Sequence, residues 1–263
     1  MSERHAHGAR RSGRARSQHF LRKRALAAEL VRDAGVGAGD LVLDLGAGSG
    51  RLTAELARAA GRVIAVELDP RWSGHLRGRW PNVEVVEADA AAMRLPRVPF
   101  RVVANLPFAS TTAILRNLLD DPRVPLHRAD VVVEWPVALK RSLPWPSTLN
   151  DVVWGAWYST SLARRLPRNA FDPPPSVDAG VLVLERRACP LVPERCASDY
   201  RRFVAVGFRR GLRGVAAART LRRLGLAAAA PRELDPHQWA ALYSGYRRPE
   251  RLSQIRHEGV THP

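Results

Sequence analysis

One short stretch, Asn105-Leu106-Pro107-Phe108, places an amide, a rigid turn and an aromatic ring directly after the apolar run Val102-Val103-Ala104. A strand that only filled a core would not need this ending. The Asn105 side chain and the Leu106 carbonyl are hydrogen-bond acceptors, and Pro107 stiffens the turn that follows. Two acceptors could bind the hydrogens of a purine amine and draw its nitrogen towards tetrahedral geometry, while Phe108 stacks on the base. The stretch therefore predicts a site that modifies the exocyclic amine of a base.

A glycine-rich turn, Gly46-Ala47-Gly48-Ser49-Gly50, lies between a predicted strand and a predicted helix. Glycines there allow tight backbone angles and let a ligand lie against the main chain. The spacing is GxGxG, not the GxGxxG that binds a pyrophosphate, and the acidic Asp44 precedes it. Both features favour S-adenosylmethionine, whose methionine part carries no phosphate, over a dinucleotide.

Two carboxylates support this interpretation. Glu67 ends the next predicted strand, where an acidic side chain can accept hydrogen bonds from both ribose hydroxyls. Asp89 follows a third strand-like run and could accept the amino group of adenine. Either one alone would more often be a surface charge. Together, at the carboxyl ends of strands in one sheet and beside a glycine-rich turn, they indicate a ligand site.

The elements that must position these groups alternate between strand-like and helix-like segments. A first helical pattern begins at Leu21 and ends near Gly35. Short apolar runs with helices between them are typical of a parallel sheet covered on both faces. The predicted strands are 41–45, 62–67, 83–87, 100–105, 130–134, 157–166 and 181–185, and the helices among them are 52–60 and 111–119. After the Pro-rich segment 189–193 the pattern predicts only helices, at 198–207, 214–224 and 236–243.

These patterns divide the chain into three parts. Residues 1–16 are rich in Arg, His, Ser and Gly with almost no large apolar groups, so we expect a disordered basic tail. Residues 17–188 are predicted to form an α/β catalytic domain. Residues 189–263 are predicted to form a helical C-terminal domain that binds RNA.

The net charge of +17 arises from 42 Lys and Arg against 25 Asp and Glu. Nearly all the basic residues are Arg, whose planar guanidinium pairs well with phosphate. A GC-rich genome would explain the replacement of Lys by Arg but not the basic excess. We therefore expect a nucleic-acid partner rather than an anionic membrane surface, since no amphipathic anchor accompanies the charge.

The sequence also argues against a membrane partner and a metal. No stretch approaches the roughly 18 to 20 apolar residues of a membrane span, and no apolar signal core follows the basic start. A cytoplasmic, monomeric protein is expected. The two cysteines, Cys189 and Cys196, form no CxxC pair and have no nearby His at ligand spacing, so we expect no metal site.

The chain resembles the ribosomal RNA adenine N6-methyltransferases, and within them the Erm type, over roughly residues 17–245. The segments that carry the resemblance are SQHFL (17–21), VLDLGAGSG (42–50), VIAVELD (63–69), EAD (87–89), NLPFASTTAIL (105–115), EWPVALKR (134–141) and AFDPPPSVDAGVL (170–182). The resemblance implies a Rossmann-like methyltransferase domain whose seven-stranded sheet has its last strand antiparallel. It also implies methylation of one adenine in the peptidyl-transferase region of 23S rRNA before ribosome assembly, and resistance to macrolides, lincosamides and streptogramin B.

The resemblance also implies roles for individual residues. The methionine end of the cofactor would lie against Gln18, His19 and Leu21, with the turn of Gly46, Ala47 and Gly48 beneath it. The ribose and adenine would lie against Glu67, Leu68, Asp89 and Ala90. Asn105 would also border the cofactor. The reacting amine would meet Asn105, Leu106 and Pro107, and the base would lie between Phe108 and Phe171. The family usually has Asn at position 19, which puts the side-chain contact of His19 in question.

Two alternatives remain open. A housekeeping small-subunit rRNA dimethyltransferase would use the same cofactor and amine motifs, although that group usually has a larger C-terminal domain and a different run where this chain has EWPVALKR. A non-enzymatic RNA-binding protein on the same fold would tolerate loss of the cofactor residues, and none is lost here. The sequence does not distinguish transfer of one methyl group from transfer of two.

Overall fold

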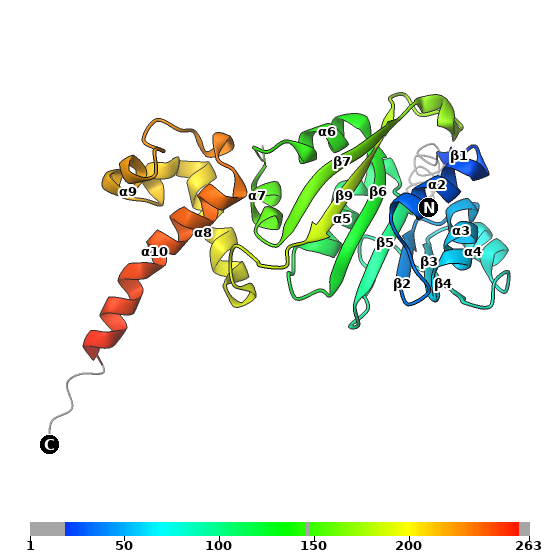
Figure 1. Ribbon diagram of the computed structural model, residues 1–263, viewed down its shortest axis with the longest axis horizontal. Coiled ribbons are helices and arrows are strands. Elements are labelled where there is room, and N and C mark those ends of the chain that lie inside the picture. Colours follow the sequence, from blue (N-terminus) through cyan, green and yellow to red (C-terminus); the bar gives the residue numbers. More distant parts are fainter. Residues whose placement is uncertain (1–18, 146–147, 258–263) are drawn as a thin grey trace, which may run out of the picture. The chain divides into compact units, whose positions relative to one another are not determined.

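The computed structural model describes residues 19–145 and 148–257 (Figure 1). The predicted basic tail 1–16 and Gln18 lie outside this range. The chain divides into two compact units. The sheet unit contains the residues up to Ser142 together with Ser159–Arg186, and the helical unit contains Leu143–Tyr158 together with the residues from Arg187 onward.

The sheet unit is built on a seven-stranded sheet with the order β4-β3-β2-β5-β6-β9-β7. Strands β2 to β6 are parallel, and β9 runs antiparallel to β6, with Val131 opposite Leu182. This confirms the α/β prediction and the antiparallel last strand. The strand bounds are β2 Leu41–Leu45, β3 Arg62–Glu67, β4 Val83–Glu87, β5 Phe100–Asn105, β6 Leu126–Glu134, β7 Tyr158–Leu166 and β9 Ala179–Arg186.

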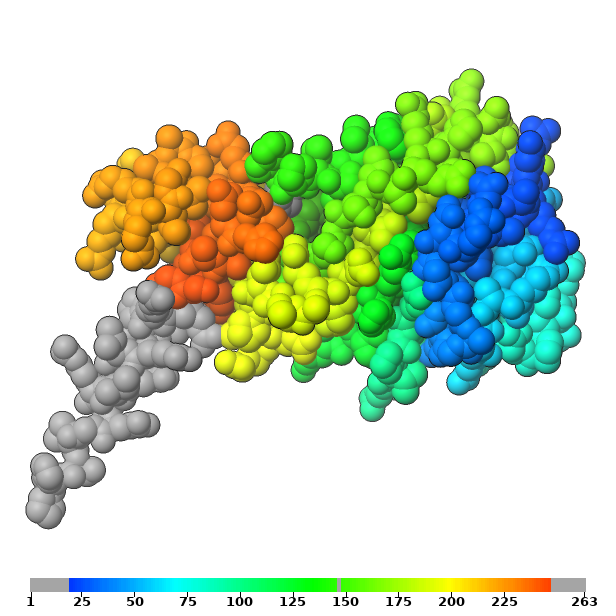
Figure 2. All heavy atoms as spheres, in the orientation of Figure 1, coloured from blue at the N-terminus to red at the C-terminus, as the bar shows by residue number. Residues whose placement is uncertain are grey.

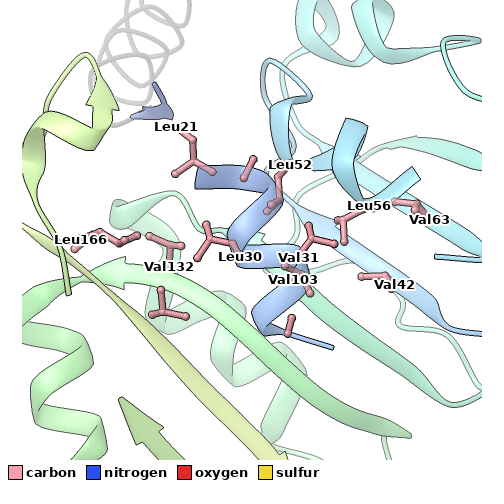
Figure 3. Packing of buried hydrophobic residues seen from close by; sticks show 14 of the residues in the cluster. Leu21, Leu30, Val31, Val42, Leu52, Leu56, Val63, Val103, Val132 and Leu166 are labelled. Atoms are coloured by element: carbon pink, nitrogen blue, oxygen red, sulfur yellow. The ribbon is translucent and has the colours of Figure 1, made fainter. Parts of the chain in front are cut away.

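Helices α2 (Arg24–Asp33) and α3 (Arg51–Ala59) bury an apolar face against this sheet. Their leucines and valines contact Val42, Val103 and Val132 of the strands (Figure 3). Burial of such side chains stabilises the fold by roughly 1.5 to 3 kcal/mol each relative to exposure. This core fixes the strand ends from which the predicted site residues emerge.

The sequence missed several short elements. Helices α4 (Pro70–Leu76) and α6 (Trp135–Ser142) join the predicted α5 (Thr111–Leu119) in the sheet unit. The first helix begins at Arg24 and not at Leu21, because β1 (Phe20–Leu21) pairs antiparallel with β8 (Phe171–Asp172). A two-residue strand has no periodicity that a sequence pattern could show.

The helical unit contains α7 (Leu149–Gly155), α8 (Ala197–Arg210), α9 (Ala218–Arg223) and α10 (Pro236–His257). Its core is aromatic: Tyr200 and Tyr243 lie 5.2 Å apart between ring centroids, and Phe203 and Trp239 lie 6.2 Å apart. The helix predicted at 214–224 is shorter in the structure, and the one predicted at 236–243 is longer.

The segment Leu143–Tyr158 was predicted to belong to the catalytic domain, which we placed before residue 189. In the structure it belongs to the helical unit. The Arg201 guanidinium of α8 donates to the Asn150 side chain of α7 at 3.0 Å, and Arg187 donates to the Gly155 carbonyl at 2.9 Å. These contacts join segments far apart in the sequence.

Candidate active site

A cleft that is partly open to solvent lies at the carboxyl ends of β2 to β5. Parallel strands bring their carboxyl ends to one edge of the sheet, which explains why groups from four strands meet here. The predicted residues that line the cleft are His19, Gly46, Gly48, Glu67, Leu68, Asp89, Ala90, Asn105, Leu106, Pro107 and Phe108. The lining residues that sequence reasoning missed are Phe20, Val66, Ala88, Ser110 and Ile114.

The glycine-rich turn presents bare backbone to the cleft. Gly46 and Gly48 have φ angles of 79° and 51°, in the left-handed region that glycine tolerates best. A Cβ atom on Gly46 would lie 2.9 Å from the Pro107 ring, and one on Gly48 would lie 2.5 Å from the Phe20 ring. Both the conformation and the close approach of the Pro107 and Phe20 rings therefore require glycine, and the turn lines the cleft with backbone alone.

Glu67 is held by two backbone N–H groups. The Gly48 N–H donates to one carboxylate oxygen and the Asp69 N–H to the other, each at 2.8 Å. The side chain is 4% exposed. Since each carboxylate oxygen has a further lone pair, Glu67 can still accept hydroxyl groups of a ligand in a fixed orientation.

Asp44 lies beneath the turn and is fully buried. The Thr53 hydroxyl donates to its carboxylate at 2.6 Å. Burial raises the pKa of Asp44 to about 7; the Thr53 hydrogen bond opposes this rise, and the nearby Glu67 charge adds to it. Asp44 does not line the cleft, so its role is to support the turn.

Asp89 lies at the opposite wall, after β4. One of its carboxylate oxygens accepts the Ala91 N–H at 3.0 Å, which fixes the turn that carries Ala88 and Ala90. Asp89 lines the cleft together with these two alanines. A carboxylate beside small apolar groups suits a flat ring with an amino group.

Asn105 ends β5 with its amide oriented by one hydrogen bond. Its Nδ2 donates to the His19 carbonyl at 2.7 Å. Its Oδ1 is buried, and among the described residues it has no hydrogen-bond partner. An unsatisfied buried acceptor costs about 1 to 3 kcal/mol, so this oxygen is a group for which a ligand donor would be favourable.

Residues 19–22 form a strap between the cleft and the loop after β8. The His19 Nδ1 lies 2.9 Å from the Pro173 carbonyl, and its ring centroid lies 5.4 Å from that of Phe108. The Arg22 N–H donates to the Ala170 carbonyl at 2.7 Å. The backbone of His19 thus contacts Asn105, and its side chain contacts the loop.

The sequence model of the family "Ribosomal RNA adenine dimethylase" matches residues 11–223. The chain belongs to the ribosomal RNA adenine dimethylase family. All of its cleft residues except Ala90 lie in the segments through which the sequence resembles this family.

Individual relatives agree with this assignment. The chain is 37% identical over 198 residues to the mycinamicin-resistance protein MyrB of Micromonospora griseorubida, a match that covers 70% of this chain and 63% of MyrB. It is 36% identical over 165 residues to an rRNA adenine N-6-methyltransferase of Corynebacterium diphtheriae, which covers 62% of this chain and 64% of that protein. These matches span less than two thirds of the length of either relative. The crystal structure of the 23S rRNA methyltransferase ErmE superposes with a TM-score of 0.76 at 29% identity, covering 87% of this chain and 100% of that one.

Three residues that we predicted to contact the cofactor or the base do not line the cleft. Leu21 and Ala47 are buried in apolar clusters of the sheet unit. Phe171 is 1% exposed and packs in the same cluster as Leu21, its partner in the β1–β8 pairing. The predicted sandwich of a base between Phe108 and Phe171 is therefore absent from this arrangement, because the strand pairing turns the Phe171 ring into the core.

Several arginines that contribute to the basic excess have intramolecular partners. Arg164 pairs with Glu29 at 3.1 Å and with Asp33 at 3.4 Å. Arg165 pairs with Asp178 at 2.7 Å, and its guanidinium lies 4.9 Å from the centre of the Trp135 ring. Charge counted along the sequence therefore overstates the charge that is open to a partner.

Two further observations concern all the residues that the structure describes. Within residues 19–145 and 148–257, no group of three or more His, Cys, Asp and Glu residues gathers at metal-binding distance. None of the helices in the same ranges is both long and apolar enough to cross a bilayer.

Proposed function

We propose that this protein transfers a methyl group from S-adenosylmethionine to N6 of an adenine in 23S rRNA. The proposal rests mainly on Asn105. Its Oδ1 is buried at the cleft and has no hydrogen-bond partner among the described residues. A neutral acceptor beside an aromatic ring suits an exocyclic amine on a base. Family membership and the names of the relatives support ribosomal RNA as the substrate class.

The residues at the end of β5 would act on the amine. Asn105 Oδ1 and the Leu106 carbonyl would each accept one of its hydrogens, which withdraws the nitrogen lone pair from the ring and turns it outward. Phe108 would stack on the base and hold the nitrogen in line. The methylated amine loses its proton readily, so these residues need no strong general base.

The residues at the ends of β2 to β4 fit the cofactor. Bound here, S-adenosylmethionine would supply an electrophilic methyl group on its sulfonium. The bare backbone of Gly46 and Gly48 would lie against the methionine part, and a Cβ on either residue would displace the Pro107 or Phe20 ring that also lines the cleft. Glu67 would accept the ribose hydroxyls, and Asp89 would accept the adenine amino group.

The relatives indicate the biological setting. MyrB is named as a mycinamicin-resistance protein, and ErmE as a 23S rRNA methyltransferase. We infer that methylation takes place in the peptidyl-transferase region of unassembled 23S rRNA, in the cytoplasm, and that the added bulk blocks macrolides, lincosamides and streptogramin B. We further infer that the protein acts as a monomer without a metal and that residues 189–263 contribute to RNA binding.

A second candidate substrate is 16S rRNA. The chain is 30% identical over 199 residues to a ribosomal RNA small subunit methyltransferase A of Chlorobium limicola, which covers 73% of this chain and 74% of that protein. The identity with MyrB is higher, at 37%. We therefore favour 23S rRNA.

Mass spectrometry of nucleosides distinguishes these substrates. Protein-free 23S and 16S rRNA would each be incubated with the full chain and labelled S-adenosylmethionine, then digested. We expect N6-methylated adenosine, with one or two methyl groups, from 23S rRNA alone. Label in 16S rRNA would support the second candidate, and no label in either RNA would contradict the enzymatic function.

A further inference from the structure

A second hollow of the sheet unit opens beside the strap. It is lined by Arg22 of the strap and by residues of segment 168–175, including Arg168 and Asn169. In Figure 2 the N-terminal segment (blue) lies against the yellow-green surface that contains residues 168–175. The Arg22 N–H binds the Ala170 carbonyl, so the two segments are joined directly.

The two arginines in this hollow differ from the other arginines nearby. Arg24 pairs with Glu55 at 2.7 Å, and Arg164 and Arg165 pair with acidic side chains as described above. Among the described residues, the guanidinium groups of Arg22 and Arg168 form no hydrogen bond and no ion pair, although the Arg168 charge is near enough to Asp178 to contribute to the lowered pKa of that carboxyl. Their charge is therefore available to an anion from outside the chain.

The rest of the lining suits a nucleotide. Phe171 and Pro175 are buried and form an apolar part of the wall, and Asn169 is an exposed amide that can donate and accept. One carboxylate, Asp172, also lines the hollow, so two cations face one anion there. The net positive charge suits a monoanionic phosphodiester better than a free phosphate with two charges.

The position of the hollow relates it to the cleft. His19 and Phe20 of the strap line the cleft, and Arg22 lines the hollow. A strand advances about 3.3 Å per residue, so Phe20 and Arg22 are about 7 Å apart along the strap. This distance is within the reach of one nucleotide, and a strand whose base enters the cleft would place its own backbone beside the strap.

We propose that Arg22 and Arg168 form a phosphodiester subsite that binds the RNA backbone next to the target adenosine. The proposal rests on the proposed function, because it takes RNA as the substrate. Backbone contacts of this kind position a strand without reading its sequence. The subsite would fix the nucleotide while Asn105 and Phe108 engage the base.

The test is a salt series of RNA binding by fluorescence anisotropy, with a short 23S rRNA hairpin and the full chain. Arg22→Ala/Arg168→Ala removes both unpaired cations. The matched control, Arg62→Ala/Arg123→Ala, removes two exposed cations that pair with Glu84 at 2.6 Å and Asp121 at 2.9 Å. Arg62 begins β3 and Arg123 precedes β6, so both lie towards the amino ends of the strands, away from the cleft. Both variants lower the net charge equally.

We expect the Arg22/Arg168 variant to bind the hairpin at least ten-fold more weakly near 0.1 M salt. Its slope of log affinity against log salt should fall by about 0.7 for each lost phosphate contact, while the control variant keeps the wild-type slope. Equal changes in the two variants would overturn the subsite, since net charge alone would then explain them. A parallel loss of S-adenosylhomocysteine affinity, measured by calorimetry, would also overturn it, because the arginines would then serve the cofactor cleft.

Mass spectrometry of the RNA after incubation with the wild-type protein tests methyl transfer independently of the phosphodiester subsite. RNA that binds with the expected slopes but acquires no N6-methyladenosine would contradict the methyl transfer and leave the subsite standing. RNA that is methylated normally by the Arg22/Arg168 variant, with unchanged KM, would contradict the subsite and leave the proposed function standing.

Discussion

The two halves of the cleft differ in whether their polar side chains have hydrogen-bond partners within the protein. In the half that we propose for the cofactor (the cofactor half), at the ends of β2 to β4, backbone N–H groups bind the carboxylates of Glu67 and Asp89. In the half that we propose for the base (the base half), at the end of β5, the Asn105 Oδ1 is buried without a partner among the described residues. The carboxylates of the first half already have backbone partners, and the second half contains an acceptor that a ligand donor would satisfy. We therefore expect that substitutions in one half can impair cofactor binding, and substitutions in the other can impair methyl transfer, independently of each other.

The largest expected effect is in the base half. Asn105→Ala removes the unpaired acceptor and should lower kcat by about 10² to 10³, the range seen when one preorganised polar contact to a reacting group is lost. S-adenosylhomocysteine affinity should fall less than about five-fold, because the Asn105 side chain bonds the His19 carbonyl and not the Glu67 or Asp89 carboxylates that we assign to the ribose and adenine. Single-turnover methylation and calorimetry measure the two quantities. Equal losses in both would mean that the halves are not separable.

In the cofactor half, Gly48→Ala should weaken S-adenosylhomocysteine binding at least ten-fold. The added Cβ would meet the Phe20 ring at 2.5 Å and would force a left-handed φ on alanine. Gly39→Ala is the matched control, because a Cβ there meets nothing within 4 Å. Calorimetry decides the matter: similar affinities for the two variants would show that the turn does not cradle the cofactor.

A smaller effect is expected from the aromatic ring of the base half. Phe108→Ala should raise the KM for RNA by about 5- to 150-fold, corresponding to roughly 1 to 3 kcal/mol of base stacking. Phe108→Tyr should stay within about three-fold of wild type, since the ring face is kept. Steady-state kinetics on the hairpin would refute stacking if the tyrosine variant were as impaired as the alanine variant.

The smallest effect concerns Asp44, which supports the cofactor half. Its pKa in the folded protein is about 7, above its ordinary value of 3.8, so the folded chain binds this proton more tightly than the unfolded chain does. The contribution of Asp44 to stability therefore declines as pH rises from about 4 to 7 and stays low above that. Asp44→Asn keeps an acceptor for Thr53. Its free energy of unfolding, measured relative to that of the wild type, should be higher at pH 8 than at pH 5.

Urea unfolding at both pH values measures this difference. Asp121→Asn is the control, because the hydrogen bond from Arg123 lowers the pKa of Asp121, which then stays charged across this range. Its effect should be the same at pH 5 and pH 8. A stability difference for Asp44→Asn that does not change with pH would show that Asp44 is already charged at pH 5.

The cofactor half was predictable from the sequence because its residues follow strands directly. Gly46, Glu67 and Asp89 each come at the end of a run whose strand character is visible, and parallel pairing brings those ends together. The same reasoning placed Asn105 correctly at the end of β5. Local pattern and sheet topology were sufficient for these positions.

The surroundings of the base half depend on contacts that no local pattern shows. The pairing of Phe20–Leu21 with Phe171–Asp172 joins segments about 150 residues apart through only two residues on each side. It turns Phe171 inward and brings His19 to Pro173. It also separates Arg22 and Arg168 from the paired arginines, a distinction that counting charges along the sequence cannot make.

The acceptor role of Asn105 can be observed directly by NMR. The hairpin would carry ¹⁵N at N6 of the target adenosine and be bound to the full chain with S-adenosylhomocysteine. We expect the amino protons to shift downfield in the wild-type complex, as hydrogen-bonded protons do, and to return towards their free positions in the Asn105→Ala complex. The same shift in both complexes, at matched saturation, would contradict the claim that Asn105 Oδ1 binds the reacting amine.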